Sequence, residues 1–158
     1  MARRIPMTPH GRQMLVNRLK RLKQVDRPHI VTVIEEARGH GDIQENAEYD
    51  AAKERQFQIS KQIEEIEHKL SLAHVIDPKK IESDKVVFGA TVTLADTDNT
   101  EQVTYKIVGS DEADIALGKI SIDSPLARAL IGKEAGDEVR VQTPKGLRRF
   151  EIVAARYE

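Results

Sequence analysis

Apolar residues recur at helical spacing through the first quarter of the chain. They form one stripe, which consists of Leu15, Leu19, Leu22, Ile30, Val33 and Ala37. Because residues three or four positions apart share one face of an α-helix, the stripe predicts an amphipathic helix. Thr8 is a typical N-cap, and Pro9 suits the first helical position. Pro28 lies inside the stripe, so we expect the helix to bend there and continue.

A second apolar stripe follows the segment "RGHGD", in which Gly39 and Gly41 favour a turn. This stripe consists of Ala47, Ala51, Ile59, Ile63, Ile66, Leu70 and Ala73. From Ile59 onward the spacing alternates between four and three, which is typical of a coiled-coil seam. Two antiparallel helices of roughly thirty residues would form a rod about 45 Å long. We therefore predict a helical hairpin that reaches outward, with residues 38–45 at its tip.

The apolar period changes from about 3.6 to 2 after the linker "VIDPKKIESDK", so strands are expected beyond it. Strand-like segments are "VVFGATVTLA", "QVTYKIVGS", "DEVRVQT" and "LRRFEIVAARYE". The segment "DSPLARALIG" predicts a short helix with Ser124 as N-cap, Pro125 at the first position and Gly132 past the end. The predicted class is α+β, with an antiparallel sheet in the second half. The expected domains are a helical hairpin over 1–76, a linker over 77–84 and a sheet domain over 85–158.

The composition limits the kind of protein and the cellular location that can be expected. The chain has 158 residues, of which 39% are hydrophobic and 32% charged, a profile typical of a soluble globular protein. It contains no cysteine, so disulfides and thiolate metal sites are excluded. No apolar run approaches the about 18 residues of a membrane span, and the polar start does not resemble a signal peptide. We expect a cytoplasmic protein that does not bind membranes.

The net charge of −1 conceals a separation of charge along the chain. Asp26 is the only acidic residue within residues 1–30. The basic residues of the same stretch are Arg3, Arg4, Arg12, Arg18, Lys20, Arg21, Lys23 and Arg27. The next stretch is mainly acidic, with Glu35, Glu36, Asp42, Glu45, Glu48, Asp50 and Glu54. A solvated helix face is the ordinary interpretation of either run. Their separation on one predicted hairpin favours a function in which one part attracts phosphate and the other cations.

Several familiar kinds of site are absent from the sequence. The segment "IGKE" lacks the flanking residues of a phosphate-binding loop, so we interpret "DEAD" at 111–114 as an acidic surface segment. The histidines at 10, 29, 40, 68 and 74 show no paired ligand spacing. With three Phe and three Tyr, a base-stacking platform is not expected. Any chemistry is therefore expected at the tip.

Asp42 and Glu45 at the tip allow two interpretations. "DIQE" matches a capping box, in which both side chains would satisfy amides at a helix start. Alternatively, both carboxylates are presented outward, since they lie at the far end of the rod and further acidic residues follow them. Two carboxylates and Asn46 are too few to enclose Mg²⁺, which prefers to keep several waters. Such a tip could complete a metal site only inside another macromolecule.

The chain resembles the bacterial Gre transcript-cleavage factors over essentially its whole length. The resemblance rests on "IPMT", "RPHIVTVIEEARGHGDIQENAEYDAAKE", "VIDP", "FGATVTL", "YKIVGSDEAD", "ISIDSPLARALIGKEAGDEV" and "TPKG". It implies a coiled coil that enters the secondary channel of bacterial RNA polymerase and an FKBP-like domain that docks at the channel rim. The factor would stimulate the polymerase's own cleavage of backtracked RNA, without being an enzyme alone. "GDIQENAEY" looks more like the GreA branch than GreB.

The resemblance also implies roles for particular residues. Asp42 would help to hold the second Mg²⁺ jointly with polymerase, with none expected on the isolated protein, and Glu45 would position or deprotonate the attacking water. The nascent RNA 3′ end would meet the basic residues Arg12, Arg18, Lys20, Arg21, Lys23 and Arg27. Gly41, Asn46 and Tyr49 would support the tip, and Ser124, Pro125 and Arg128 would dock on polymerase. A monomer is expected.

Two other functions stay open at this point. An inhibitory homologue could enter the same channel without activating cleavage, although the intact acidic pair argues against it. A prolyl isomerase could be carried by the C-terminal fold. Phe88, Tyr105, Phe150 and Tyr157 can all be explained as core, which leaves little for an aromatic substrate pocket.

Overall fold

The computed structural model describes residues 3–39 and 46–158. The chain divides into two compact units. One unit is Gln13–Leu72, which we call the hairpin unit. The other combines Met1–Arg12 with Ala73–Glu158, and we call it the sheet unit. The sheet unit therefore contains residues from both sides of the hairpin unit in the sequence.

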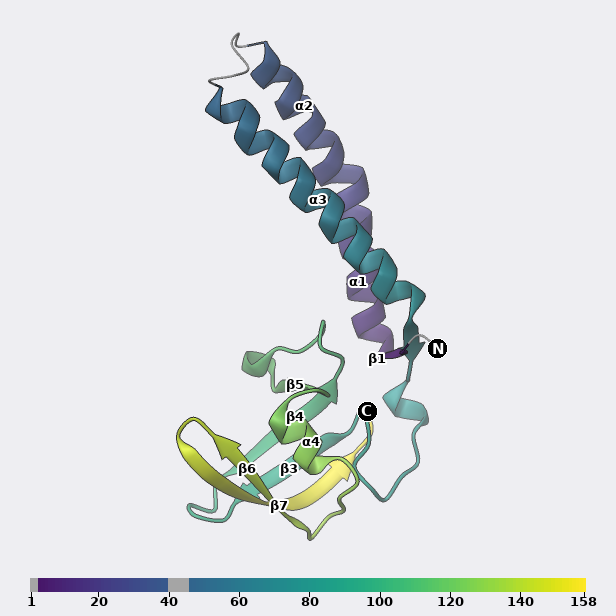
Figure 1. Cartoon of the computed structure of the whole chain (residues 1–158). Helices are drawn as coiled ribbons and strands as arrows, with labels where there is room; N and C mark the ends of the chain where they lie inside the picture. The colour runs from purple at the N-terminus through teal and green to yellow at the C-terminus, as the bar shows by residue number, and fades with distance from the viewer. Residues whose placement is uncertain (1–2, 40–45) are drawn as a thin grey trace. The chain divides into compact units, whose positions relative to one another are not determined.

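The hairpin unit is built from two antiparallel helical arms, which confirms the predicted helical hairpin (Figure 1). The first arm consists of α1 (Pro9–Arg21), the π-helix η1 (Leu22–Asp26) and α2 (Arg27–Arg38). The first four residues of α1, 9–12, belong to the sheet unit, and the rest of the arm belongs to the hairpin unit. The second arm is α3 (Ala47–Ser71), which packs along α2 and η1. In Figure 1 the two arms lie side by side along the hairpin.

The bend expected at Pro28 takes the form of a π-helical turn. The amide of Arg27 donates to the carbonyl of Leu22, which is the wider spacing of a π-helix. Pro28 has no amide hydrogen, and its ring would collide with the carbonyl four residues earlier in regular α-geometry. The π-turn lies just before Pro28, which becomes one of the first residues of α2. The first arm therefore continues through the proline.

The two arms bury complementary apolar stripes. The buried side chains of the first arm are Leu15, Leu22, Ile30, Ile34 and Ala37, and those of α3 are Ala52, Ile59, Ile63 and Ile66. Two details of the predicted stripes were wrong. Ile34 is buried while Val33 is only partly buried, and Ala52 is buried while Ala47 and Ala51 are exposed. Ala52 lies one heptad before Ile59, so it continues the seam that Ile59 begins.

The sheet unit has a five-stranded sheet with the order β5-β4-β3-β7-β6. Its strands are β3 (Thr91–Asp96), β4 (Gln102–Val108), β5 (Lys119–Ser121), β6 (Glu138–Thr143) and β7 (Gly146–Arg156). The α+β class is confirmed, and the short helix is α4 (Pro125–Leu130). The sheet is antiparallel apart from β5, which pairs parallel to β4. This parallel pair arises because the chain loops back between the two strands through the 3-10 helix η4 (Ile115–Leu117).

The core of the sheet unit lies between the sheet and α4. Its large, fully buried side chains on the strands and the helix include Val92, Leu94, Ile107, Leu130 and Ile152. The predicted aromatic contributions are confirmed: Phe88 and Phe150 belong to the core, and Tyr105 and Tyr157 pack against it. These aromatic side chains therefore stabilise the fold.

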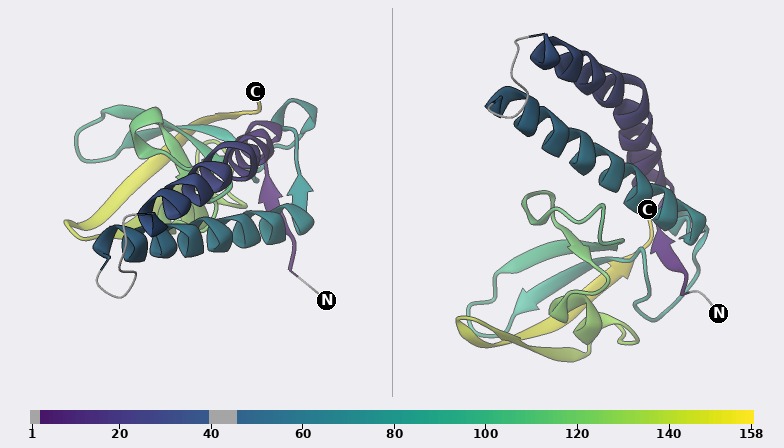
Figure 2. Two further views of the ribbon diagram at one scale, coloured as in Figure 1. Left: turned by 90° about the horizontal axis from the view of Figure 1, so that it is seen from above. Right: turned by 45° about the horizontal axis from the view of Figure 1, so that its top comes forward.

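A short strand pair closes the sheet unit where the chain leaves it and returns. β1 (Ile5–Met7) pairs parallel with β2 (Ala73–Val75), as Figure 2 shows. The amide of Ile76 extends this pairing by donating to the carbonyl of Met7 at 2.8 Å. The sequence pattern did not predict this pair, because it assigned Ala73 to the helical stripe. After β2 comes the 3-10 helix η3 (Pro78–Lys80).

Candidate functional site

The predicted acidic pair, Asp42 and Glu45, and the neighbouring Gly41 lie outside the described residues. The structure describes what flanks them: the end of α2 on one side and the start of α3 on the other.

Asn46 joins the two helix ends through both atoms of its side-chain amide. Its Oδ1 accepts a hydrogen bond from the amide of Tyr49 at 3.1 Å, which makes Asn46 the N-cap of α3. Its Nδ2 donates to the carbonyl of Ala37 at 2.6 Å. That carbonyl belongs to the last turn of α2, where carbonyl groups lack the amide of a following turn. One side chain therefore caps the start of α3 and binds the end of α2.

This geometry bears on the capping-box interpretation of "DIQE". α3 begins at Ala47 with Asn46 as its cap, later in the chain than a cap at Asp42 requires. Glu48 and Asp50 lie in the first turn of α3, where negative charge interacts favourably with the helix dipole. The guanidinium of Arg38 lies 5.9 Å from the ring centroid of Tyr49, a second contact between the two arms.

The six predicted RNA-contacting residues lie on the first arm and are solvent-accessible to different degrees. Arg12, Arg18, Lys20, Arg21 and Arg27 are exposed, and Lys23 is partly exposed. Within the part of the chain that the structure describes, ion pairs are found for Lys23 and Arg21. Lys23 Nζ lies 3.4 Å from Glu67 of α3, and Arg21 Nε lies 3.9 Å from Asp26.

The predicted docking residues lie on α4 and at its N-cap, and a polar network shapes the loop that precedes the helix. Ser124 is the N-cap of α4, and its hydroxyl donates to the carbonyl of Ser121 at 2.7 Å. Ser110 lies within 3.0 Å of both Ser121 Oγ and Asp123 Oδ2. The list of predicted docking residues is completed by Pro125 and Arg128, which are both exposed.

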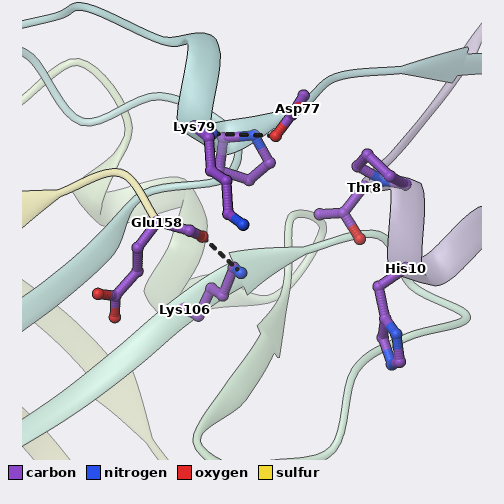
Figure 3. Close-up of a pocket in the computed structure, with 8 residues that line it drawn as sticks. Thr8, His10, Asp77, Lys79, Lys106 and Glu158 are labelled. Atoms are coloured by element: carbon purple, nitrogen blue, oxygen red, sulfur yellow. Dashed lines mark hydrogen bonds between the residues drawn. The ribbon is translucent and has the colours of Figure 1, made fainter.

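A shallow pocket lies in the sheet unit where the start of α1 meets η3 and the end of β7 (Figure 3). Its charged lining consists of Asp77, Lys79, Lys106 and Glu158, together with the imidazole of His10. Lys106 Nζ donates to the backbone carbonyl of Glu158 at 3.0 Å. The lining therefore carries charged groups of both signs.

The interpretation of "DEAD" as an acidic surface segment was wrong for Glu112. Glu112 is 5% exposed, and Asp114 caps η4 by accepting from the amide of Ala116 at 3.1 Å. Local sequence could not reveal this burial, because the partner of Glu112 is Thr8, far away in the chain.

No cluster of three or more potential metal ligands occurs within residues 3–39 and 46–158. In the same described part of the chain, no helix is long and apolar enough to cross a membrane. The described residues define a class of protein that combines a helical hairpin unit with an α+β sheet unit.

Comparison with known proteins identifies the family. The sequence model "Transcription elongation factor, N-terminal" matches residues 5–75, and "Transcription elongation factor, GreA/GreB, C-term" matches residues 81–157. The transcription elongation factor GreA of Neisseria meningitidis serogroup A is 56% identical over 155 residues, which are 98% of each chain. GreA of Halorhodospira halophila is 57% identical over 156 residues, covering 98% of this chain and 99% of the relative. The chain belongs to the GreA/GreB family of transcription elongation factors.

Solved structures also match over nearly the whole chain. The transcription factor Gfh1 matches with a TM-score of 0.47 at 29% identity, covering 98% of this chain and 99% of that one. The GreA/GreB factor of Nitrosomonas europaea matches with a TM-score of 0.44 at 23% identity, covering 98% of this chain and all of that one. Membership of the family implies binding to RNA polymerase and a role as a factor that is not itself catalytic.

Proposed function

We propose that this protein enters the secondary channel of bacterial RNA polymerase and stimulates cleavage of backtracked RNA by the polymerase. The observation that carries this proposal is the match to GreA over 98% of both chains at 56% identity. The helical hairpin supports it, because two thin antiparallel arms can reach into a channel. Cleavage would leave a new RNA 3′ end, from which an arrested polymerase resumes synthesis.

Asp42 and Glu45 are proposed to act at the reacting phosphodiester. Carboxylates are suitable ligands for Mg²⁺, but two of them are too few to hold the ion alone, so polymerase would supply the remaining ligands. A bound Mg²⁺ would stabilise the charge that develops during phosphodiester hydrolysis. Asp42 would contribute a ligand to that site, and Glu45 would orient the attacking water or accept its proton.

The flanks of the tip support this assignment. Since Asn46 already caps α3 and binds the end of α2, the helix start does not require Asp42 as a cap. The proposed tip-supporting role of Asn46 and Tyr49 rests on these contacts and on the stacking of Arg38 over Tyr49. Gly41 is also proposed to support the tip, on the basis of the family resemblance alone.

The exposed cations of the first arm are proposed to contact the extruded RNA. A cation gains most from a phosphate when it is not already paired, and the attraction weakens as salt rises. Lys23 and Arg21 have carboxylate neighbours, so their contribution should be smaller. The main contacts are therefore assigned to Arg12, Arg18, Lys20 and Arg27.

The start of α4 is proposed to dock on the channel rim, with the protein acting as a monomer. Hydrogen bonds among Ser110, Ser121, Asp123 and Ser124 support a preformed loop. A loop that is ordered before binding loses less conformational entropy on docking. Pro125 and Arg128 are exposed beside it and available for contact.

The test uses purified backtracked polymerase complexes and reads the length of the RNA. The parent factor should shorten the RNA, whereas the highly purified factor without polymerase should show no Mg²⁺-dependent nuclease activity. Asp42→Asn and Glu45→Gln should melt close to the parent and compete with it for polymerase, yet stimulate cleavage far less. A neutral amide is a poor Mg²⁺ partner, which is the reason for this expectation.

Two results would contradict the proposal. Parental cleavage rates with Asp42→Asn would show that the carboxylate has no role at the metal. A parent protein that binds polymerase and slows transcription without shortening RNA would instead identify an inhibitory homologue.

A further inference from the structure

The first turn of α1 lies against the loop that follows β4, and both belong to the sheet unit. We infer that Glu112 is a positioning residue that fixes this turn, and with it the base of the hairpin's first arm. Its carboxylate Oε1 accepts a hydrogen bond from the hydroxyl of Thr8. The two residues are 104 positions apart in the sequence, so the contact joins the N-terminal segment to the C-terminal sheet.

The direction of every hydrogen bond in this junction is determined by its chemistry. The amide of Gly11 can only donate, so at 3.0 Å it uses the Thr8 hydroxyl oxygen as acceptor. The hydroxyl hydrogen of Thr8 is then free to point to Glu112, whose ionised carboxylate can only accept. Thr8 therefore caps α1 and binds the sheet unit with one hydroxyl group. Its backbone carbonyl also accepts from the amide of Arg12 at 3.0 Å.

The junction is buried and its charge is compensated. Thr8 is 2% exposed and the Glu112 side chain 3% exposed. The second carboxylate oxygen of Glu112 lies 3.3 Å from Nζ of Lys119, the first residue of β5. A buried carboxylate is tolerated when it is paired and hydrogen-bonded, and hydrogen bonds to charged groups are stronger than neutral ones. Glu112 is therefore held from the strand side and bound from the helix side.

Two glycines allow the close approach at this junction. A Cβ added to Gly11 would lie 2.8 Å from Oε1 of Glu112, and one added to Gly109 would lie 2.7 Å from the backbone carbonyl of Pro6. Gly11 lies inside α1, where glycine costs helix stability relative to alanine. The contact with Glu112 gives a reason for glycine at this position.

The functional consequence rests on the proposed function. The start of α4, which is proposed to dock on polymerase, belongs to the sheet unit. The acidic tip lies between α2 and α3, and the first arm that leads to it begins with the turn bound to Glu112. Loss of the Thr8–Glu112 bond should therefore leave docking intact and impair delivery of the tip. Catalysis is sensitive to such displacement, because small misplacements of a reacting group can cost large factors in rate.

The first measurement is hydrogen exchange on the full-length protein without polymerase. Glu112→Met keeps a long side chain but removes both acceptors, and Glu101→Met is the matched control at an exposed glutamate. Amides of residues 11–14 should exchange at least about tenfold faster in Glu112→Met, as expected for loss of a hydrogen bond to a charged group. Amides of β3 and β7 should keep parental protection. Unchanged exchange at residues 11–14, or equal acceleration throughout the sheet, would overturn the assignment.

Gly11→Ala gives an independent test, because helix propensity and the junction predict opposite changes in the exchange rate. Propensity alone would slow exchange in the first turn, whereas contact of the new methyl group with Glu112 should accelerate it. Gln13→Ala, at an exposed position of the same helix, controls for propensity. Slower exchange in Gly11→Ala, matching Gln13→Ala, would count against the junction.

Cleavage titrations on backtracked complexes then test the positioning role. Glu112→Met should lower the maximal stimulated rate by about tenfold or more. The factor concentration that gives half of the maximal effect should stay within about twofold of the parent. Glu112→Gln, which can still accept from Thr8, should recover most of the rate. A raised half-maximal concentration with a parental maximum would refute the role. A parent without cleavage activity would refute the proposed function alone, because hydrogen exchange still decides the junction.

Discussion

Substitution of Asn46 offers a direct test of how the two arms are joined next to the tip. Asn46 accepts from the amide of Tyr49 and donates to the carbonyl of Ala37, so its side chain contributes two separable hydrogen bonds. Asn46→Ser keeps an N-cap acceptor but is too short to replace the amide donor. Asn46→Ala removes both functions. Comparison of the two variants therefore separates the cap from the bridge.

The expected magnitudes follow from these contacts. Replacing an N-cap by alanine costs about 1 kcal/mol of the free energy of unfolding, within a range of about 0.5–2 kcal/mol. Ala37 is 2% exposed, so its carbonyl loses a partner that water cannot readily replace. Loss of that hydrogen bond should cost about 1 kcal/mol more. We expect Asn46→Ser to lose about 1 kcal/mol and Asn46→Ala about 2 kcal/mol.

The assay is urea unfolding followed by circular dichroism at 222 nm, which reports mainly on the helices of the hairpin unit. If the parent and both variants show the same dependence of unfolding free energy on urea concentration, a shift in the urea midpoint reports a change in stability. Equal losses for serine and alanine would show that the cap contributes nothing. A serine variant as stable as the parent would instead refute the bridge to Ala37.

Further outcomes follow from packing and charge. Ile59→Ala should cost about 3 kcal/mol because the side chain is 1% exposed, whereas Phe57→Ala, at 60% exposed on the same helix, should be nearly neutral by urea unfolding. The hydrogen bond from Arg148 holds the pKa of Asp96 below its usual range. The pair therefore stabilises the folded state fully above the unfolded pKa of about 3.9, and this stabilisation is lost as pH falls through the lowered pKa of the folded state. The stability difference between the parent and Arg148→Met should therefore shrink on acidification below that range; a constant difference in urea titrations would contradict it. Gly109→Ala should lower the melting temperature, because the new methyl group meets a backbone carbonyl that cannot rotate away, and an unchanged melting curve would disprove this contact.

The helical hairpin could be predicted from sequence because its apolar stripes are local and periodic. Ile59, Ile63 and Ile66 defined the seam, and the structure buries all of them. The phase was wrong toward the start of α3, where the residues are small. Alanines lie on several faces there, and only extension of the heptad from Ile59 selects Ala52.

The features that sequence did not reveal depend on distant partners or on irregular backbone. Glu112 belongs to an acidic run, and its burial depends on Thr8 at the opposite end of the chain. The parallel pairing of β5 with β4 depends on the path of a loop. Asn46 was expected to support the tip, but its bond to Ala37 requires the folded hairpin. The arrangement of Asp42 and Glu45 lies outside the described residues, so their roles stay predictions.

The parallel pairing of β1 with β2 makes the hairpin unit an insertion within the sheet unit. Ile5 pairs with Ala73, so the points where the chain departs and returns are neighbours in space. An insertion with adjacent ends can change in length without altering the frame that carries it. Adding one heptad to each arm would move the tip outward by about 10 Å while keeping the seam in register. The reach of such a factor could therefore evolve, or be engineered, independently of its docking surface.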